Sequence, residues 1–429
     1  MLKAERREIL PRVNLTCVHT DKFKTSFITL NLINGISRES IASYQLISRV
    51  LRRGTAKLPD MEAIAGALDE LYGADINPNT RKIGELLGSG LTASFLSDDL
   101  VPKGENLLEH VAALLGEMLL NPRTENGLLY AEYVESEKRN AIDEIRATIN
   151  EKRSYAIRQL TRKMCADEKF GIFSEEEDIQ AITTESLTAQ YKKWLAESRV
   201  EILYAGTAEF DTVAAALGAA LAELPRAQVG AEPTTDIRLV PVTEEPRFFT
   251  ESLDVLQGQL VFGFRLGETM KNPDYAALSV FNTVYGGGVT SKLFLNVREK
   301  LSLAYYASSG VIDYKGIMIA FAGVEFTKRE LAESEILAQL EAMRRGEIEE
   351  WEFQFAKRAV VSGMVANLDS PGGIEGTYFD MIMKGLDCAP EELAQRAEAV
   401  TLQQVVDIAN SVKLDSVYFL QGTEVGNEQ

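Results

Sequence analysis

Three polar side chains share one face of a helix predicted early in the chain. Apolar residues recur with helical spacing through Ile41–Leu51. Gln45, Ser48 and Arg49 then fall together on another face, at positions i, i+3 and i+4. Hydrolysis by a zinc-bound water needs imidazole or carboxylate ligands and a base. An amide, a hydroxyl and a guanidinium provide neither, and Arg49 would place a fixed positive charge where a cation must sit.

A second pair of side chains with useful chemistry lies in the other half of the chain. Arg298 and Tyr305 stand seven residues apart. A guanidinium and a phenol are both hydrogen-bond donors, and both suit an oxygen that is gaining negative charge. The alternative interpretation is structural, with Arg298 as a surface helix charge and Tyr305 as a half-buried strand residue. The sequence leaves both interpretations open.

The run Gly286–Gly288 precedes this pair and resembles a phosphate-binding loop only superficially. No GxxxxGK[ST] pattern accompanies it, and it does not follow a strand that leads into a nucleotide-type helix. We therefore predict a tight connection between helices, in which glycine permits positive φ and a close approach of backbones.

Histidine and cysteine are too scarce and too scattered to build a conventional catalytic or metal site. His19 and His110 lie far apart without metal-ligand spacing. Cys17, Cys165 and Cys388 form no CxxC pattern, which argues against a disulfide framework and a cysteine zinc site. No Ser-His-Asp or Cys-His arrangement is credible. We expect no bound metal and no cofactor.

The elements that must position these residues recur in the same order in both halves of the chain. Each half opens with a strand, continues through amphipathic helices and a long helix, and closes with a strand. We interpret this as one unit that occurs twice. The paired elements are strands 26–32 and 259–266, helices 41–52 and 274–285, helices 106–120 and 331–345, the long helices around Lys138 and Lys357, and strands 200–205 and 416–421.

A proline-containing segment, residues 225–246, separates the halves and has the composition of a linker. We therefore predict an N-terminal domain at residues 1–224 and a C-terminal domain at residues 247–429. Strands followed by several helices do not alternate as a parallel α/β sheet requires. The expected class is α+β, with two homologous domains that each consist of an antiparallel sheet covered by helices.

Composition excludes several classes of partner. The chain has 429 residues and a net charge of −19, which argues against nucleic acid and anionic membrane surfaces. Its first residues contain no apolar signal core, and its longest apolar run, residues 213–222, is too short to span a bilayer. We expect a cytoplasmic protein with no membrane partner.

Several motifs resemble the insulinase/pitrilysin family of zinc metallopeptidases, the inverzincins, which include the mitochondrial processing peptidases and bacterial relatives. The resemblance covers nearly the whole chain. Gly286–Phe294 and then Arg298–Tyr305 are very similar to the family's Gly-Gly-Gly…Ser-x-Leu-Phe…Arg-Glu-Lys-Leu-Gly-Leu-Ala-Tyr. Arg53-Gly54-Thr55 resembles a Lys-Gly-Thr-like turn that follows the zinc helix, and 77–80 resembles Asn-Ala-x-Thr. The resemblance implies the LuxS/processing-peptidase type of metallopeptidase fold.

The resemblance also implies which positions are degenerate. The family's His-x-x-Glu-His aligns with Gln45, Ser48 and Arg49, and its third zinc ligand aligns with Glu135. Without imidazoles, we expect Glu135 to be a solvated helix carboxylate. Arg298 and Tyr305 match the two residues that, in active relatives, reach the zinc site, hold the substrate backbone and contact the scissile carbonyl.

Pro78 is a further departure from the family, whose members add the substrate peptide as a strand to this segment. A proline at a sheet edge removes one donor and blunts the edge. The first half would then have lost peptide capture as well as zinc. In a milder alternative, the missing N–H faces away from the pairing side.

Two functional hypotheses follow from the resemblance. In the first, the chain is a catalytically degenerate bacterial member that is no enzyme on its own. It forms a heterodimer with an active zinc-bearing homologue, which supplies His-x-x-Glu-His, and together they enclose a peptide substrate in a processing chamber. In the second, the chain is a non-proteolytic scaffold, for example a homodimer. An active hydrolase of unrelated chemistry lacks any supporting constellation.

Overall fold

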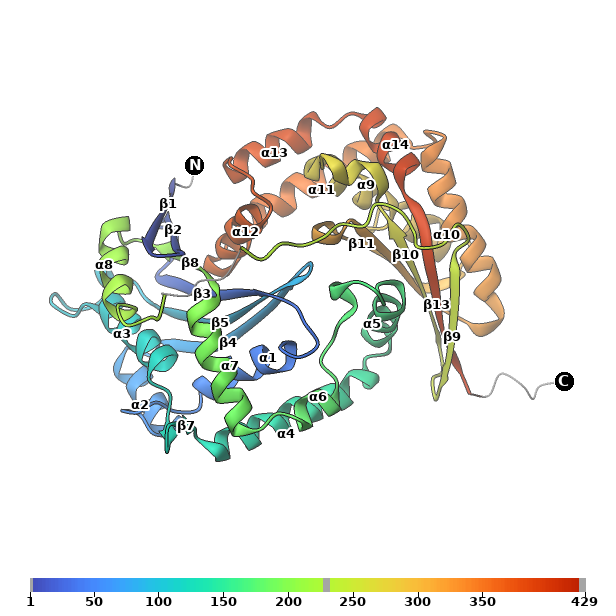
Figure 1. The fold of residues 1–429 in the computed structure, drawn as a ribbon. Coiled ribbons are helices and arrows are strands. Elements are labelled where there is room, and N and C mark those ends of the chain that lie inside the picture. The colour runs from blue at the N-terminus through green and yellow to red at the C-terminus, as the bar shows by residue number, and fades with distance from the viewer. Residues whose placement is uncertain (1–2, 227–231, 424–429) are drawn as a thin grey trace. The chain divides into compact units, whose positions relative to one another are not determined.

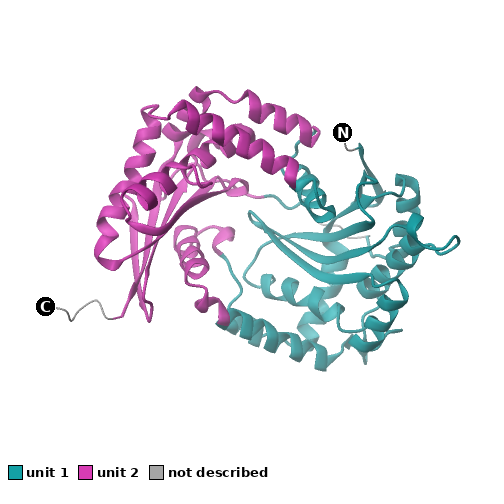
Figure 2. Cartoon of the chain, turned by 180° about the vertical axis from the view of Figure 1, so that it is seen from behind, with its two compact units in different colours: residues 1–146, 172–234, 367–387 teal, residues 147–171, 235–366, 388–429 magenta. Residues whose placement is uncertain are grey.

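The computed structural model describes residues 3–226 and 232–423, so residues 227–231 of the predicted linker lie outside it. The chain folds into two compact units (Figure 2). Unit 1 comprises residues 1–146, 172–234 and 367–387, and unit 2 comprises residues 147–171, 235–366 and 388–429. Each unit contains one large sheet (Figure 1).

The sheet of unit 1 has six strands in the order β1-β2-β8-β3-β5-β4. Its neighbours are antiparallel except for β2 and β8, which are parallel. The two outer strands, β1 and β4, carry many charged and polar residues, which is typical of protected sheet edges. The strands are β1 (Lys3–Leu10), β2 (Val13–His19), β3 (Thr25–Gly35), β4 (Asp75–Ile83), β5 (Leu86–Leu96) and β8 (Arg199–Gly206).

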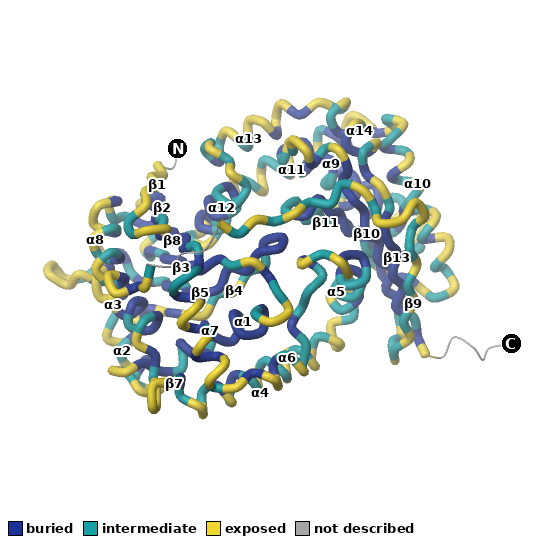
Figure 3. Tube along the Cα trace, viewed as in Figure 1, coloured by how far each residue is buried: buried dark blue, intermediate teal, exposed yellow. Residues whose placement is uncertain are grey.

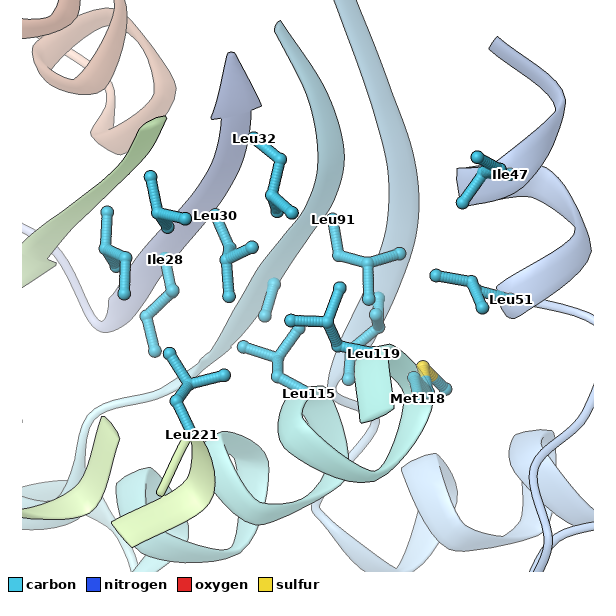
Figure 4. Close-up of a cluster of buried hydrophobic side chains, with 14 of the residues drawn as sticks. Ile28, Leu30, Leu32, Ile47, Leu51, Leu91, Leu115, Met118, Leu119 and Leu221 are labelled. Atoms are coloured by element: carbon cyan, nitrogen blue, oxygen red, sulfur yellow. The ribbon is translucent and has the colours of Figure 1, made fainter. Parts of the chain in front are cut away.

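Helices cover one face of this sheet and enclose the main core of unit 1. Ile28 and Leu30 of β3 meet Leu115 and Leu119 of the covering helix α3 (Figure 4). The alternation of β3 directs Ile28, Leu30 and Leu32 to this face, and the residues between them, Thr29 and Asn31, are buried on the other face. The helices of unit 1 and its small hairpin are α1 (Ile41–Leu51), α2 (Met61–Glu70), α3 (Leu107–Leu120), β6 (Thr124–Glu125), β7 (Leu128–Leu129), α4 (Ala131–Ala147), α6 (Glu176–Gln180), α7 (Thr184–Glu197) and α8 (Phe210–Ala220).

The sheet of unit 2 has five strands in the order β11-β12-β10-β13-β9. All eight residues of its central strand β10 are buried. The trace around β10 is dark blue in Figure 3, the colour of buried residues. Only β9 and β13 pair in parallel. The strands are β9 (Arg247–Leu253), β10 (Gly258–Arg265), β11 (Ala304–Ile312), β12 (Ile317–Val324) and β13 (Lys413–Gly422).

The helices of unit 2 pack mainly on one face of this sheet, over Leu260, Phe262 and Phe264 of β10. They are α9 (Tyr275–Tyr285), α10 (Arg329–Arg344), α11 (Glu350–Asn367), α13 (Pro390–Ala399) and α14 (Leu402–Ser411). A π-helix, η5 (Leu293–Lys300), precedes β11. Short 3₁₀ turns occupy 98–100, 148–150, 169–171, 267–271, 313–315 and 326–328.

Each unit also contains one helix from the opposite half of the sequence. Helix α5 (Lys152–Met164) packs on the second face of the unit 2 sheet, where Leu160 and Met164 meet Val261 of β10. Helix α12 (Pro371–Met383) packs against β3 and β8 of unit 1. The units are therefore not the predicted continuous halves 1–224 and 247–429. The exchange has a physical reason, because each sheet has a second face that must be covered.

The predicted fold class is confirmed, with one refinement. Strands and helices occur twice in the same order, and β2-β8-β3-β5-β4 matches β9-β13-β10-β12-β11 position by position. Each sheet is mixed, because the closing strand of each unit runs parallel to an opening strand. Among the described residues, no helix is long and apolar enough to cross a membrane.

Candidate functional site

The face of α1 that carries the degenerate motif lies inside unit 1. Ile47 and Val50 bury the opposite side of the helix in the core. Gln45 is half-buried, and its side-chain oxygen accepts a hydrogen bond from Ser174. The Ser48 hydroxyl is fully buried and has no hydrogen-bond partner among the described residues.

Arg49 is held by a carboxylate from helix α4. Its Nη1 and Nη2 donate to Glu144 Oε1 and Oε2 at 2.8 Å and 2.7 Å, which is a bidentate ion pair. This hydrogen bonding with Glu144 raises the pKa of Arg49, with the charge of Glu137 adding to the effect. Arg49 therefore stays a cation on the face where a metal ion would have to sit.

The structure does not bring Glu135 to this face. Glu135 is exposed and accepts a hydrogen bond from Lys138 Nζ at 3.1 Å. Glu137 is the buried carboxylate of α4, and its Oε1 lies 2.9 Å from Arg53 Nε. The sequence interpretation missed Glu137. A signal for it was present, since Val134, Glu137 and Glu144 follow one helical stripe and Glu135 does not.

The residues on this face do not fit zinc. The side chains of α1 here are an amide, a hydroxyl and a guanidinium, and both nearby α4 carboxylates are paired with arginine. His19 ends β2 beside Glu209, and His110 is exposed on α3. Within residues 3–226 and 232–423, no group of three or more His, Cys, Asp or Glu residues could hold a metal.

Pro78 lies in β4, which is an edge strand of the unit 1 sheet. The carbonyl of Ile76 accepts a hydrogen bond from Arg52 Nε at 2.5 Å, so it points to the outer edge. Backbone groups two residues apart in a regular strand point the same way, and β4 pairs with β5 without a bulge. The N–H that Pro78 lacks therefore belongs to the outer edge, which favours a blunted edge over the milder alternative.

In unit 2, Arg298 and Tyr305 line one pocket of about 430 Å³. Arg298 sits in the π-helix η5, a rare conformation that is frequent at functional sites. Tyr305 sits in a β-bulge, because Ala304 pairs with Val324 and Tyr306 with the preceding Gly323. The bulge leaves Tyr305 outside the ladder, and the residue is 61% exposed.

Ring, ion-pair and hydrogen-bond contacts position the charged side chains that line this pocket. The Arg298 guanidinium stacks over the Phe294 ring, 4.7 Å from its centroid, and its Nε is 3.6 Å from Glu299. Lys328 Nζ lies 3.0 Å from Glu325 and donates to the carbonyl of Ser302 at 3.3 Å. Ser302 has φ of +49°, which gives the chain a sharp turn between η5 and β11.

The glycine run before η5 shows one of the two features predicted for it, the close approach of backbones, but not the positive φ. Residues 286–288 do not adopt positive φ. A Cβ on Gly286 would lie 2.6 Å from the backbone nitrogen of Ser309, and the Gly286 carbonyl accepts hydrogen bonds from Ser308 and Ser309. Close approach to β11 is therefore the reason for glycine here, and this contact covers part of the β11 edge.

Comparison with known proteins finds several that are similar to this chain. The family profile described as "Peptidase M16 inactive domain" matches residues 181–360. The "Probable inactive metalloprotease YmfF" of Bacillus subtilis (strain 168) is 29% identical over 409 residues, covering 95% of each chain. The "Uncharacterized zinc protease YmxG" of the same strain is 25% identical over 176 residues, covering 39% of this chain and 43% of YmxG.

A solved structure agrees with these sequence comparisons. The crystal structure of a conserved protein from Enterococcus faecalis V583 superposes with a TM-score of 0.89 at 26% identity, and the match covers 99% of this chain and 100% of that one. Similarity therefore extends over the whole fold. In this chain the fold carries an α1 face without zinc ligands and a pocket in unit 2 that Arg298 and Tyr305 line. Residues 181–360 are therefore similar to the inactive domain of M16 peptidases, and nearly the whole chain is similar to a relative described as a probable inactive metalloprotease.

Proposed function

We propose that this chain is the non-zinc subunit of a two-chain peptidase. Its partner is an active homologue that carries His-x-x-Glu-His, and the two chains enclose a peptide-processing chamber. One observation carries the proposal: Arg298 and Tyr305 line the same pocket with exposed side chains, whereas the α1 face is filled by paired arginines.

The chemistry of the pocket suits a peptide backbone. Arg298 and Tyr305 offer N–H and O–H donors to a carbonyl oxygen, and donors placed where negative charge develops stabilise it most. Neither side chain supplies a nucleophile or activates water, so hydrolysis has to come from the partner. YmfF, described as a probable inactive metalloprotease, and YmxG, described as an uncharacterized zinc protease, occur in one strain, and this proposal needs such a combination of types.

The test is steady-state kinetics on the chain reconstituted with a zinc-bearing homologue from its own organism. Arg298→Ala or Tyr305→Phe should each lower kcat about 10²–10³-fold, as the loss of one oxyanion donor does. Zinc content and heterodimer affinity should not change. Tyr72→Phe and Arg345→Ala are matched controls, because both residues are exposed and hydrogen-bond only a nearby carboxylate. Unchanged kcat in both pocket variants would refute the proposal.

A specific observation favours a second candidate, the non-proteolytic scaffold. Pro78 and Arg52 blunt the outer edge of β4, so unit 1 offers little for a substrate strand to pair with. In this case the purified chain would form a homodimer or bind an unrelated protein, and no zinc-bearing homologue would accompany it. Affinity purification of the tagged chain from its own cell separates the two candidates, and fractionation of the same cells tests the predicted cytoplasmic location.

A further inference from the structure

Two arginine–glutamate pairs connect α1 to α4 on the face where the family places zinc. Arg49 pairs with Glu144, and Arg53, just after α1, pairs with Glu137. The arginine that comes first in the sequence pairs with the glutamate that comes second, as in two helices that run antiparallel. The two pairs therefore join the helices at two different positions along their axes. Arg53 also donates to Ser136, which fixes its guanidinium on α4.

The two pairs differ in how much water reaches them. The side chains of Arg53 and Glu137 are 25% and 10% exposed, and those of Arg49 and Glu144 are 31% and 61% exposed. A carboxylate as buried as Glu137 is costly unless a cation pairs with it. Loss of the Arg53–Glu137 pair should therefore destabilise the fold. The more solvated Arg49–Glu144 pair should contribute little free energy and mainly orient the two side chains between α1 and α4.

We propose that these two pairs have replaced the metal as the cross-link between α1 and α4. A metal ion at such a site ties ligands from separate elements together and adds its binding free energy to folding. A guanidinium is a permanent cation with several directed donors, so it can hold carboxylates in place without any metal supply. Unit 1 then keeps the arrangement of α1 and α4 in a metal-independent form, whether or not the chain pairs with a zinc-bearing homologue.

A double-mutant cycle on the full-length chain tests this cross-link. Arg53→Met leaves Glu137 buried without its cation and should lower the Tm by about 5–10 °C. Glu137→Met leaves Arg53, which is less buried, and should lower it by a smaller amount. The double variant should be more stable than Arg53→Met, because two apolar side chains replace the whole pair. Glu135→Met is the matched control on the exposed side of α4 and should shift the Tm by at most about 1–2 °C.

Hydrogen exchange and a chelator complete the experiment. In Arg53→Met, backbone amides of α4 should exchange faster, while those of α10 in unit 2 should not change. The Tm of the unmutated chain should be the same with and without a chelator. If Arg53→Met unfolds the protein, the reversed pair Arg49→Glu with Glu144→Arg provides a second test, since it should restore the Tm that either single change lowers. Additive effects in both cycles, or a Tm that falls with chelator, would overturn the proposal.

Discussion

Lys315 Nζ lies 2.8 Å from Glu168 Oε2, and both side chains are buried inside unit 2. Glu168 follows the exchanged helix α5, and Lys315 occupies the turn between β11 and β12. Arg265 of β10 lies between two carboxylates, 2.5 Å from Glu168 and 3.0 Å from Asp415. This buried network joins the exchanged segment to the sheet that it covers.

The network should therefore be strongly sensitive to the loss of one charge. Glu168→Gln leaves Lys315 and Arg265 buried with too little negative charge, and we expect it to cost about 3–5 kcal/mol. Equilibrium denaturation in urea, followed by a probe in unit 2, measures the loss. Asp167→Asn is the matched control, because Asp167 is exposed where it pairs with Arg238, and it should cost about 1 kcal/mol or less. Equal effects of the two changes would contradict a structural role for the network.

The same network predicts loss of stability in acid. Burial by itself would raise the pKa of Glu168, but hydrogen bonds from Arg265 and Lys315 outweigh it and the net pKa is lowered. When folding lowers the pKa of a carboxyl group, the group stabilises the fold at pH values above its pKa in the unfolded chain, which is about 4.3 for glutamate. This stabilisation is lost as the pH falls through the pKa of the folded state. Unit 2 should unfold more readily below about pH 4, and Glu168→Gln should flatten this pH dependence.

Glu375 of α12 should show the opposite pH dependence in unit 1. Burial raises its pKa, and the Arg81 guanidinium at 3.0 Å only partly offsets the shift. A raised carboxyl pKa means that the folded state binds the proton more tightly, so stability falls as the pH rises through the folded pKa. Glu375→Gln should therefore gain stability relative to the unmutated chain between about pH 4.3 and neutrality. Thermal unfolding of both proteins across this range tests the sign, and parallel curves would exclude it.

The periodic spacing of apolar residues predicted where helices and strands lie. It did not predict which sheet each helix covers. The repeated apolar spacing of α1, α3 and α9 gave their bounds to within about two residues, as amphipathic helices usually permit. The apolar residues of α5, such as Ala156 and Leu160, do not specify which sheet the helix covers, because they could pack on the apolar face of either sheet. Buried ion pairs between residues distant in sequence, such as Glu168 with Arg265, accompany the exchange, and a single sequence does not reveal which charges pair.

A small error of alignment explains the missed carboxylate in the site. Each residue turns a helix by about 100°, so a shift of two positions moves a side chain by about 200°, to nearly the opposite face. Glu135 and Glu137 differ by this shift, and only Glu137 faces the arginines. By contrast, Arg298 and Tyr305 share a pocket because a π-helix, a turn at Ser302 and a bulge orient them, and simple periodicity predicts none of these.

The three cysteines should differ widely in reactivity. Burial, with the charges of Glu209 and Glu5, raises the pKa of Cys17 to about 12, and burial with the charge of Glu168 raises that of Cys165 to about 12. The thiolate is the reactive form, so both should be inert near pH 8. Cys388 is partly exposed. A thiol reagent should thus titrate one cysteine in the folded chain, and Cys388→Ser should remove this reaction. A second fast thiol would contradict the buried positions.

Rebuilding the zinc ligands should reveal which α4 carboxylate faces α1. A variant with imidazoles and a carboxylate on α1 should bind zinc only weakly, because Arg53 still pairs with Glu137 and keeps it from the metal. Adding Arg53→Ala frees Glu137, and zinc affinity measured by calorimetry should rise. In that background Glu137→Gln should lower affinity about 10–100-fold or more, whereas Glu135→Gln should not. Dependence on Glu135 instead would mean that α4 is rotated relative to this structure. The three α1 changes are Gln45→His, Ser48→Glu and Arg49→His.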